Sequence, residues 1–83
     1  MYVKSEIVTM LDGRTKAFAR VWLDHKVMID SVKLIAGENG LFVAMPSEKS
    51  NNGKYYSLVK IEDKNLYQQI EGSVIDAYTA KFS

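Results

Sequence analysis

Cationic and aromatic side chains alternate over residues 14–22 in a pattern that could bind nucleic acid. Residues 15–23 are rich in β-branched and aromatic types, which is typical of a strand. Alternate residues of a strand share a face, and one face here collects Arg14, Lys16, Phe18, Arg20 and Trp22. The cations of such a face can neutralise phosphates, and its rings can stack on bases at about 1–3 kcal/mol per base.

The same face has a second interpretation, because two aromatic residues in a strand also suit a core or a dimer interface. The Asp12-Gly13 pair is typical of a tight hairpin turn. If it closes a two-residue loop, three apolar residues of the preceding strand share the aromatic face: Val3, Ile7 and Leu11. The cations would then reach out around an apolar layer. Interface and nucleic-acid contact both stay open at this point.

A second candidate site is the polar loop of residues 47–54, which follows the only proline, Pro46. Lys49 and Lys54 could contact phosphates, and the two serines and two asparagines of the loop could donate hydrogen bonds. Glu48 offsets one of the two positive charges. A solvated loop without a binding role would have a similar composition, so this assignment also stays open.

Catalytic and metal-binding chemistry has little support. The only histidine, His25, follows Asp24 in an expected turn, where neighbouring side chains usually point apart, and no nucleophile is placed beside it. The aspartates lack calcium-loop spacing, and without cysteine there is no thiolate metal site. We therefore predict that the protein is not an enzyme and needs no cofactor, metal or small-molecule substrate.

Size and composition indicate one small domain over residues 1–83. The net charge is +1, from eleven basic and ten acidic residues, so a nucleic-acid surface needs local segregation of charge. The first residues lack the apolar core of a signal peptide, and no apolar run approaches the ~20 residues that span a bilayer. We expect a cytoplasmic protein without membrane contact. Because a domain of this size has a thin core, we expect two copies to associate.

Five segments have the character of strands: residues 2–10, 15–23, 26–35, 41–45 and 55–61. In the third segment the apolar parity changes near Asp30-Ser31, and a β-bulge there would keep one apolar face. Residues 41–45 form a continuous apolar run, typical of a central strand buried on both faces. Pro46 should end that strand.

The hydrophobic period changes after residue 62. Asp63 suits a helix N-cap, and an apolar stripe at helical spacing follows it: Leu66, Ile70, Val74, Ala77 and Tyr78. The second strand offers a small, apolar face on which a helix could lie closely: Thr15, Ala17, Ala19, Val21 and Leu23. The expected fold class is α+β, an antiparallel meander of about five strands with a C-terminal α-helix, in a dimer.

Several of these residues also resemble a known family. The resemblance is carried, without gaps, by Asp12-Gly13-Arg14, Ala17, Ala19, Leu23-Asp24-His25, Gly37, Asn39-Gly40 and the stretch Leu41 to Ser47. In order and spacing they are similar to the SpoVG family of small bacterial proteins, and residues 70–78 resemble its C-terminal helix. The resemblance implies a homodimeric α+β protein of the bacterial cytoplasm, linked to septation, sporulation and gene regulation, that binds DNA and RNA.

The chain departs from the family pattern at three places. Basic residues commonly follow the Met-Pro-Ser motif of the family, whereas Glu48 and Lys49 stand here. Residues 6–10 of the opening strand carry no base, although the family tends to have arginines there. Residues 59–61 read Val-Lys-Ile in place of an expected His-Pro-Ile. Each phosphate contact that is lost flattens the salt dependence of binding by roughly one unit of slope.

The leading hypothesis is a small dimeric regulator that binds DNA or RNA through Arg14, Lys16, Arg20, Lys49 and Lys54. A dimer brings two copies of these cations to one surface, which compensates for the low net charge of each chain. The alternative is a protein-interaction module without nucleic-acid binding, because exposed sheet edges accept strands from partners.

Overall fold

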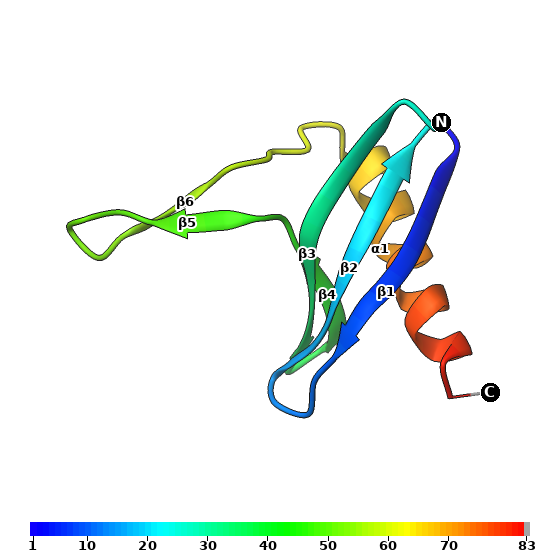
Figure 1. Ribbon diagram of the computed structural model, residues 1–83, viewed down its shortest axis with the longest axis horizontal. Coiled ribbons are helices and arrows are strands. Elements are labelled where there is room, and N and C mark those ends of the chain that lie inside the picture. The colour runs from blue at the N-terminus through cyan, green and yellow to red at the C-terminus, as the bar shows by residue number, and fades with distance from the viewer. Residues whose placement is uncertain (83) are drawn as a thin grey trace.

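A four-stranded sheet, a separate two-stranded hairpin and one helix make up the structure, a computed structural model that describes residues 1–82 (Figure 1). In chain order the elements are β1 (Val3–Met10), β2 (Thr15–Leu23), β3 (Val27–Gly37), β4 (Gly40–Ala44), β5 (Ser47–Lys49), β6 (Tyr55–Ser57) and α1 (Lys64–Ala80). The main sheet has the order β1-β2-β3-β4 with antiparallel neighbours, and β5 pairs with β6. The α+β class, the antiparallel meander and the C-terminal helix are thereby confirmed.

The strand count needs a correction, because the meander has four strands rather than about five. Residues 47–54, expected as a loop, begin with β5, and residues 55–61, expected as a strand of the meander, supply only the short β6. Pro46 ends the β4 segment as expected, and the chain then leaves the main sheet (Figure 1). Ser47–Lys49 has no apolar alternation, so the hydrophobic pattern could not reveal this strand.

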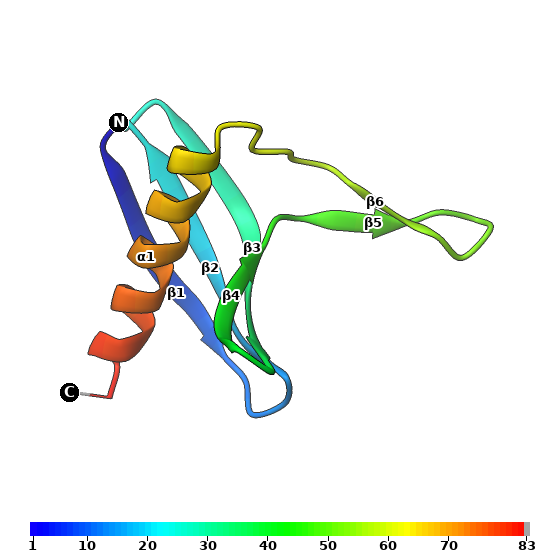
Figure 2. The ribbon, with the colours of Figure 1, turned by 180° about the vertical axis from the view of Figure 1, so that it is seen from behind.

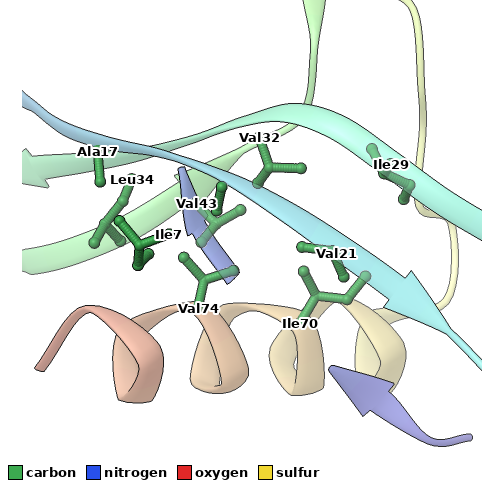
Figure 3. Packing of buried hydrophobic residues seen from close by; sticks show 10 residues of the cluster. Ile7, Ala17, Val21, Ile29, Val32, Leu34, Val43, Ile70 and Val74 are labelled. Carbon is green, nitrogen blue, oxygen red and sulfur yellow. The ribbon is translucent and has the colours of Figure 1, made fainter. Parts of the chain in front are cut away.

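One face of the main sheet carries the core, and α1 covers it (Figure 2). Ala17, Ala19 and Val21 of β2 are fully buried, as are Ile70 and Val74 of α1. Figure 3 shows side chains of β2, β3 and β4 directed at the helix. The two alanines allow close approach, which confirms that the small apolar face of β2 receives the helix.

The helix begins as the sequence predicts. Asp63 is the N-cap, and its carboxylate accepts hydrogen bonds from the backbone N–H groups of Asn65 and Leu66. Leu66, Ala77 and Tyr78 of the expected stripe are partly buried against the core.

The bulge expected in the third strand is present. The β2–β3 register shifts between Ala19 and Val21, where the extra residue falls at Asp30-Ser31. Ser31 has a φ of 59° and donates its N–H to Oδ1 of Asp30 at 2.8 Å. This extra residue lets Ile29 and Val32 both face the helix side, where both are buried.

The β1 register differs from the two-residue loop considered for Asp12-Gly13. Leu11 donates its N–H to the carbonyl of Lys16, so the turn is longer than two residues. Ile7 pairs with Ala19 and Val3 pairs with Leu23, which places both on the helix side and not beside Phe18. The face changes because the β1–β2 register shifts by one residue between Ile7 and Thr9, and a shift of one residue moves the side chains beyond it to the other face.

The β4 strand lies at an edge of the main sheet, and the expectation of a central strand buried on both faces is wrong. Of its five residues only Val43 is buried, whereas Phe42 is exposed. The run is apolar at successive positions for two reasons. Val43 packs in the core beneath the helix, whereas Phe42 lies on the uncovered face of the sheet. Within residues 1–82, no helix has the length and apolar character needed to cross a membrane.

Candidate nucleic-acid interface

Two surfaces of the described chain lie away from the core and carry three of the five candidate cations: Arg20, Lys49 and Lys54. The first is the open face, defined as the side of the main sheet opposite α1, with Lys4, Glu6, Thr9, Thr15, Phe18, Arg20, Trp22, Met28, Lys33, Ile35, Phe42 and Ala44. The second is the arm, defined as residues 47–57, which projects from the sheet as the β5–β6 hairpin (Figure 1). The two surfaces differ in chemistry, and the difference determines what each can bind.

Cross-strand rows organise the open face. Lys4, Trp22 and Met28 are aligned in one row, with the Lys4 Nζ 5.6 Å from the centre of the Trp22 ring. That distance is within the range of a cation–π contact. In another row, Phe18 lies between Thr9 and Lys33. Aromatic rings and cations thus interleave on this side of the sheet, although the cations beside Trp22 and Phe18 are Lys4 and Lys33.

Acidic residues surround the one arginine of the open face. Arg20 is paired across the strands with Glu6, and its Nε lies 3.4 Å from Oδ1 of Asp30. Both side chains of this ion pair are about half exposed, at 42% for Arg20 and 55% for Asp30. Two carboxylates therefore offset the charge of Arg20, which makes it less available to a phosphate than the sequence suggests.

Arg14 and Lys16 lie at one end of the sheet and not in the row of Phe18 and Trp22. Arg14 is in the turn before β2 and accepts a hydrogen bond from Ala36 with its carbonyl. The β2–β3 register shifts between Thr15 and Ala17, which interrupts the alternation on which the shared face was predicted. The same shift pairs Thr15 with Ile35, on the open face rather than beneath the helix.

The arm has a regular ladder and a closed tip. Each of its six strand residues is exposed. At the tip, Ser50 donates its N–H and its hydroxyl to the Lys54 carbonyl, at 2.7 and 2.9 Å. Oδ1 of Asn52 accepts from the Ser50 hydroxyl and, at 3.1 Å, from the Lys54 N–H. Gly53 has a φ of 84°, as a left-handed turn position requires. The Ser50 hydroxyl and the Asn52 side-chain carbonyl are thus used within the tip.

Hydrogen bonds close the base of the arm and hold the preceding strand, β4, against the helix. Leu58 donates its N–H to the Pro46 carbonyl at 2.9 Å, which joins the two ends of the arm. In β4, before the arm begins, two side chains of α1 bond to the backbone of Val43. The Tyr67 hydroxyl donates to the Val43 carbonyl, and the Glu71 carboxylate accepts from the Val43 N–H at 3.3 Å. The two helical side chains are four residues apart and therefore lie on one face of the helix.

Burial raises the pKa of the Tyr67 phenol above its ordinary value of 10.0, and the negative charge of Glu71 raises it further. Tyr67 therefore keeps its proton and remains a donor well above neutral pH. Neither Tyr67 nor Glu71 stands out in the sequence as a candidate residue. Their spacing beside Ile70 of the apolar stripe is the signal that could have found them.

The five predicted cations fall in three places. Arg14 and Lys16 lie at the end of the sheet, Arg20 is on the open face, and Lys49 and Lys54 are on the arm. Within residues 1–82, Arg20 is the one member of this set in an ion pair. A single chain does not bring the five together, and their binding role stays a prediction. Lys4 and Lys33, which the prediction omitted, are cations of the open face; Lys33 lies between the buried Val32 and Leu34 of β3, and Lys4 between half-buried residues of β1.

The Asp24-His25 turn has local contacts that account for both residues. Both have positive φ, 53° and 58°. Oδ1 of Asp24 accepts the backbone N–H of Tyr2 at 2.7 Å, and the His25 ring stacks on the Tyr2 ring with centroids 4.7 Å apart. The carboxylate and the imidazole thus contact Tyr2 in different ways, and no bond between them organises a dyad in the described chain.

Comparison with known proteins agrees with the fold and the motifs. A family model described as SpoVG matches residues 2–80. A Finegoldia magna protein is 39% identical over 72 residues, covering 87% of this chain and 67% of that protein. A Bacillus subtilis protein is 34% identical over 67 residues, covering 81% of this chain and 69% of that protein. Both relatives carry the name "Putative septation protein SpoVG". With a family match over nearly its whole length, this chain belongs to the SpoVG family.

Proposed function

We propose that this chain is a dimeric regulator that binds DNA or RNA, acting in the cytoplasm in processes such as the septation for which its relatives are named. The observation that carries the proposal is the arm. It presents Lys49, Lys54 and Tyr55 to solvent on a ribbon that extends away from the core. Cations and an exposed ring on a projecting ribbon are suited to phosphates and bases.

The open face is the surface that we assign to dimerisation. Phe18 and Trp22 are half-buried there, while Met28 and Phe42 are 46% and 38% exposed. A second copy packed on this face would bury these side chains, as small domains commonly require. In a two-fold interface the same patch meets itself, so the acids near Arg20 could pair with cations of the other copy.

This arrangement leaves the other four cations outside the interface. Arg14, Lys16, Lys49 and Lys54 would then occur twice in the assembly, which raises the local density of positive charge although each chain has a net charge of only +1. Each cation that neutralises a phosphate of duplex DNA adds about 0.9 to the slope of log K against log salt. The slope of log K against log salt therefore reports how many phosphates the protein contacts.

Binding is tested by fluorescence anisotropy with labelled DNA and RNA oligonucleotides at 50 and 200 mM salt. We expect affinity to fall steeply with salt, and the double variant Lys49→Gln/Lys54→Gln to bind more weakly with a slope that is flatter by about 1–2 units per arm engaged. Lys81→Gln is the matched control, because Lys81 follows α1 at the end far from the arm (Figure 2). Absence of binding at 50 mM salt, or affinity independent of salt, contradicts the proposal.

Association is tested separately by sedimentation equilibrium. We expect a mass twice the 9.4 kDa of one chain. Trp22→Glu should shift the population toward the single-chain mass, because it replaces the largest aromatic side chain of the open face with a charge. Tyr55→Ser, on the arm, should leave the mass unchanged. A wild-type protein that stays at the single-chain mass at high concentration contradicts the dimer.

One observation favours a second function, a protein-interaction module without nucleic-acid binding. Each strand of the two-stranded arm has an outer edge that could pair with a strand from a partner protein. The corresponding edge of the main sheet is less suitable at Val43, where Tyr67 and Glu71 already satisfy the backbone. Capture of a defined protein that survives nuclease treatment, with no binding to oligonucleotides, would favour this function.

A further inference from the structure

We infer that the arm binds single-stranded nucleic acid through one of its two faces, the one that carries Lys49 and Tyr55. The inference rests on the proposed function and specifies which strand state and which side chains of the arm are involved. The register of the hairpin places Ser47 opposite Ser57, Glu48 opposite Tyr56 and Lys49 opposite Tyr55.

Residues directly opposite each other in an antiparallel pair share a face, and successive residues alternate. One face of the arm, named the basic face, therefore consists of Ser47, Lys49, Tyr55 and Ser57. The opposite face, named the acidic face, consists of Glu48 and Tyr56. Although Glu48 and Lys49 are neighbours in the sequence, their side chains project to opposite sides of the ribbon.

A hydrogen bond further commits Glu48 to the acidic face. The Tyr56 hydroxyl donates to Oε2 of Glu48 at 3.1 Å. This contact occupies the polar end of Tyr56 and holds the carboxylate beside it, away from Lys49. The glutamate that stands where the family commonly has a base therefore leaves the basic face without an acidic residue.

The composition of the basic face matches the parts of a single strand. Tyr55 is 70% exposed, so its ring is free to stack on a base, and Lys49 lies opposite it to contact a phosphate. The Ser47–Ser57 pair lies on the same face, two positions nearer the body. Its small side chains leave room for a base lying flat on Tyr55, and its hydroxyls can bond to phosphate or sugar.

Stacking favours single strands over duplexes. In a duplex, each base is already stacked between its neighbours, so Tyr55 could reach a base face only after local unpairing. One lysine on the basic face also gives a weak electrostatic contact with a duplex. A two-stranded ribbon can enter the major groove, and the experiment distinguishes that mode from stacking.

The test compares paired variants of the two faces. Fluorescein-labelled mixed-sequence 15-nucleotide DNA and RNA, each as single strand and as duplex, are titrated with wild type and with Tyr55→Ser, Lys49→Gln, Tyr56→Ser and Glu48→Gln. We expect Tyr55→Ser to weaken single-strand binding about 5- to 100-fold and Lys49→Gln to weaken it by a smaller factor. Tyr56→Ser and Glu48→Gln should change it less than about 2-fold, since surface substitutions away from a contact have small effects.

A conservative replacement separates stacking from folding. Tyr55→Trp keeps an aromatic ring at this position and should restore single-strand affinity, whereas a purely structural role for the hydroxyl would not be restored. Far-ultraviolet circular dichroism and the oligomeric mass should be the same for all variants, because the substituted side chains are exposed.

The outcomes distinguish this inference from the proposed function. If wild type binds single strands but Tyr56→Ser weakens binding as much as Tyr55→Ser does, or Tyr55→Ser has no effect, the assignment of the basic face is wrong while nucleic-acid binding stands. If Tyr55→Ser weakens duplex and single-strand binding equally, the arm enters a groove and stacking is wrong. If wild type binds neither form at 50 mM salt, the proposed function fails as well.

Discussion

The body and the arm of this small protein are stabilised in different ways. The body, residues 3–44 with α1, contains all ten residues that are buried in the described chain. The arm contains none of them, and its strand residues are all exposed. The body therefore depends on apolar burial, while the arm depends on hydrogen bonds within its own ladder and tip.

This difference explains why the candidate binding residues of the arm can vary without loss of the fold. An isolated two-stranded hairpin is marginal in water, so the arm relies on its own ladder and tip, on the Leu58–Pro46 bond that closes its base, and on a preceding strand that α1 holds at Val43. The exposed strand residues of the arm are then available to bind a partner. A change such as a glutamate at position 48 alters binding chemistry and leaves the core untouched.

Deleting Arg20 should lower the stability of the fold more than any other change considered, because it shifts the strand register that keeps the core residues of the body buried. Arg20 is part of the regular alternation of β2, so its removal turns Val21 and Leu23 to the open face and Trp22 toward the helix. Exposing a large apolar side chain costs about 1.5–3 kcal/mol. Exposing Val21 and Leu23 together would therefore remove a large part of a total stability of about 5–15 kcal/mol. Urea denaturation followed by circular dichroism should show no cooperative transition, or one near zero denaturant.

Deleting Ser31 is the matched control. Ser31 is the extra residue of the bulge, and without it Ile29 and Val32 follow regular alternation and still face the helix. The deletion also removes a left-handed residue that costs about 1–2 kcal/mol. We expect a cooperative transition shifted by no more than this amount. A loss equal to that of the Arg20 deletion would show that the bulge has a role beyond register.

The body could be predicted from the sequence to a large extent because apolar spacing reports burial. The helix stripe, the Asp63 cap and the β3 bulge all leave a periodic or positional signal. The β1 register left none, since an unpredicted bulge between Ile7 and Thr9 places Val3 and Ile7 on the other face. The edge position of β4 was missed because an apolar run has the same appearance in two cases: a strand buried on both faces, and a strand buried on one face with an uncovered apolar face on the other side.

The candidate site was less predictable, since it depends on register and on contacts between distant residues. The alternation that grouped Arg14 with Phe18 fails at the shift beside Lys16. The pairing of Arg20 with Asp30 requires the bulge to bring the carboxylate into reach. In the arm, the separation of Glu48 from Lys49 appears only once residues 47–49 are known to be a strand.

Ile70→Ala tests the contrast between the regions by a side-chain change in the body. Ile70 is fully buried between α1 and the sheet, and removing such a side chain costs about 2–5 kcal/mol. Tyr55→Ala, which removes a larger side chain from the arm, should change the free energy of unfolding by less than about 0.5 kcal/mol. Both values come from urea titration at one protein concentration. Comparable losses at the two sites would mean that the arm is packed against a partner in solution.

Tyr67→Phe tests the contact between α1 and β4, the strand that precedes the arm. The change leaves the Val43 carbonyl without its donor in a residue that is 1% exposed, at a cost of about 1–3 kcal/mol. Because the pKa of Tyr67 is raised in the folded state, its contribution is complete below pH ~10, the unfolded value. It is lost as pH rises above that value through the higher folded pKa.

The measurement is the difference in unfolding free energy between wild type and Tyr67→Phe at pH 8 and at pH 11. Effects of high pH that are common to both proteins cancel in the difference. We expect the advantage of wild type to shrink at pH 11. A difference that stays constant across this range would show that the Tyr67 proton is not what caps β4.

Asn52→Ala should have the smallest global effect and the most local one. Oδ1 of Asn52 accepts from the Ser50 hydroxyl and the Lys54 N–H, and both donors can bond to water once the tip loosens. A hydrogen bond contributes about 0.5–1.5 kcal/mol, so amide exchange at Ser50, Gly53 and Lys54 should accelerate about 2- to 10-fold by NMR. Exchange at Val21 in the body should not change, because local opening of the arm does not require unfolding of the sheet. Equal acceleration at Val21 would mean that arm and body open as one cooperative unit, and the independence of the two regions would be wrong.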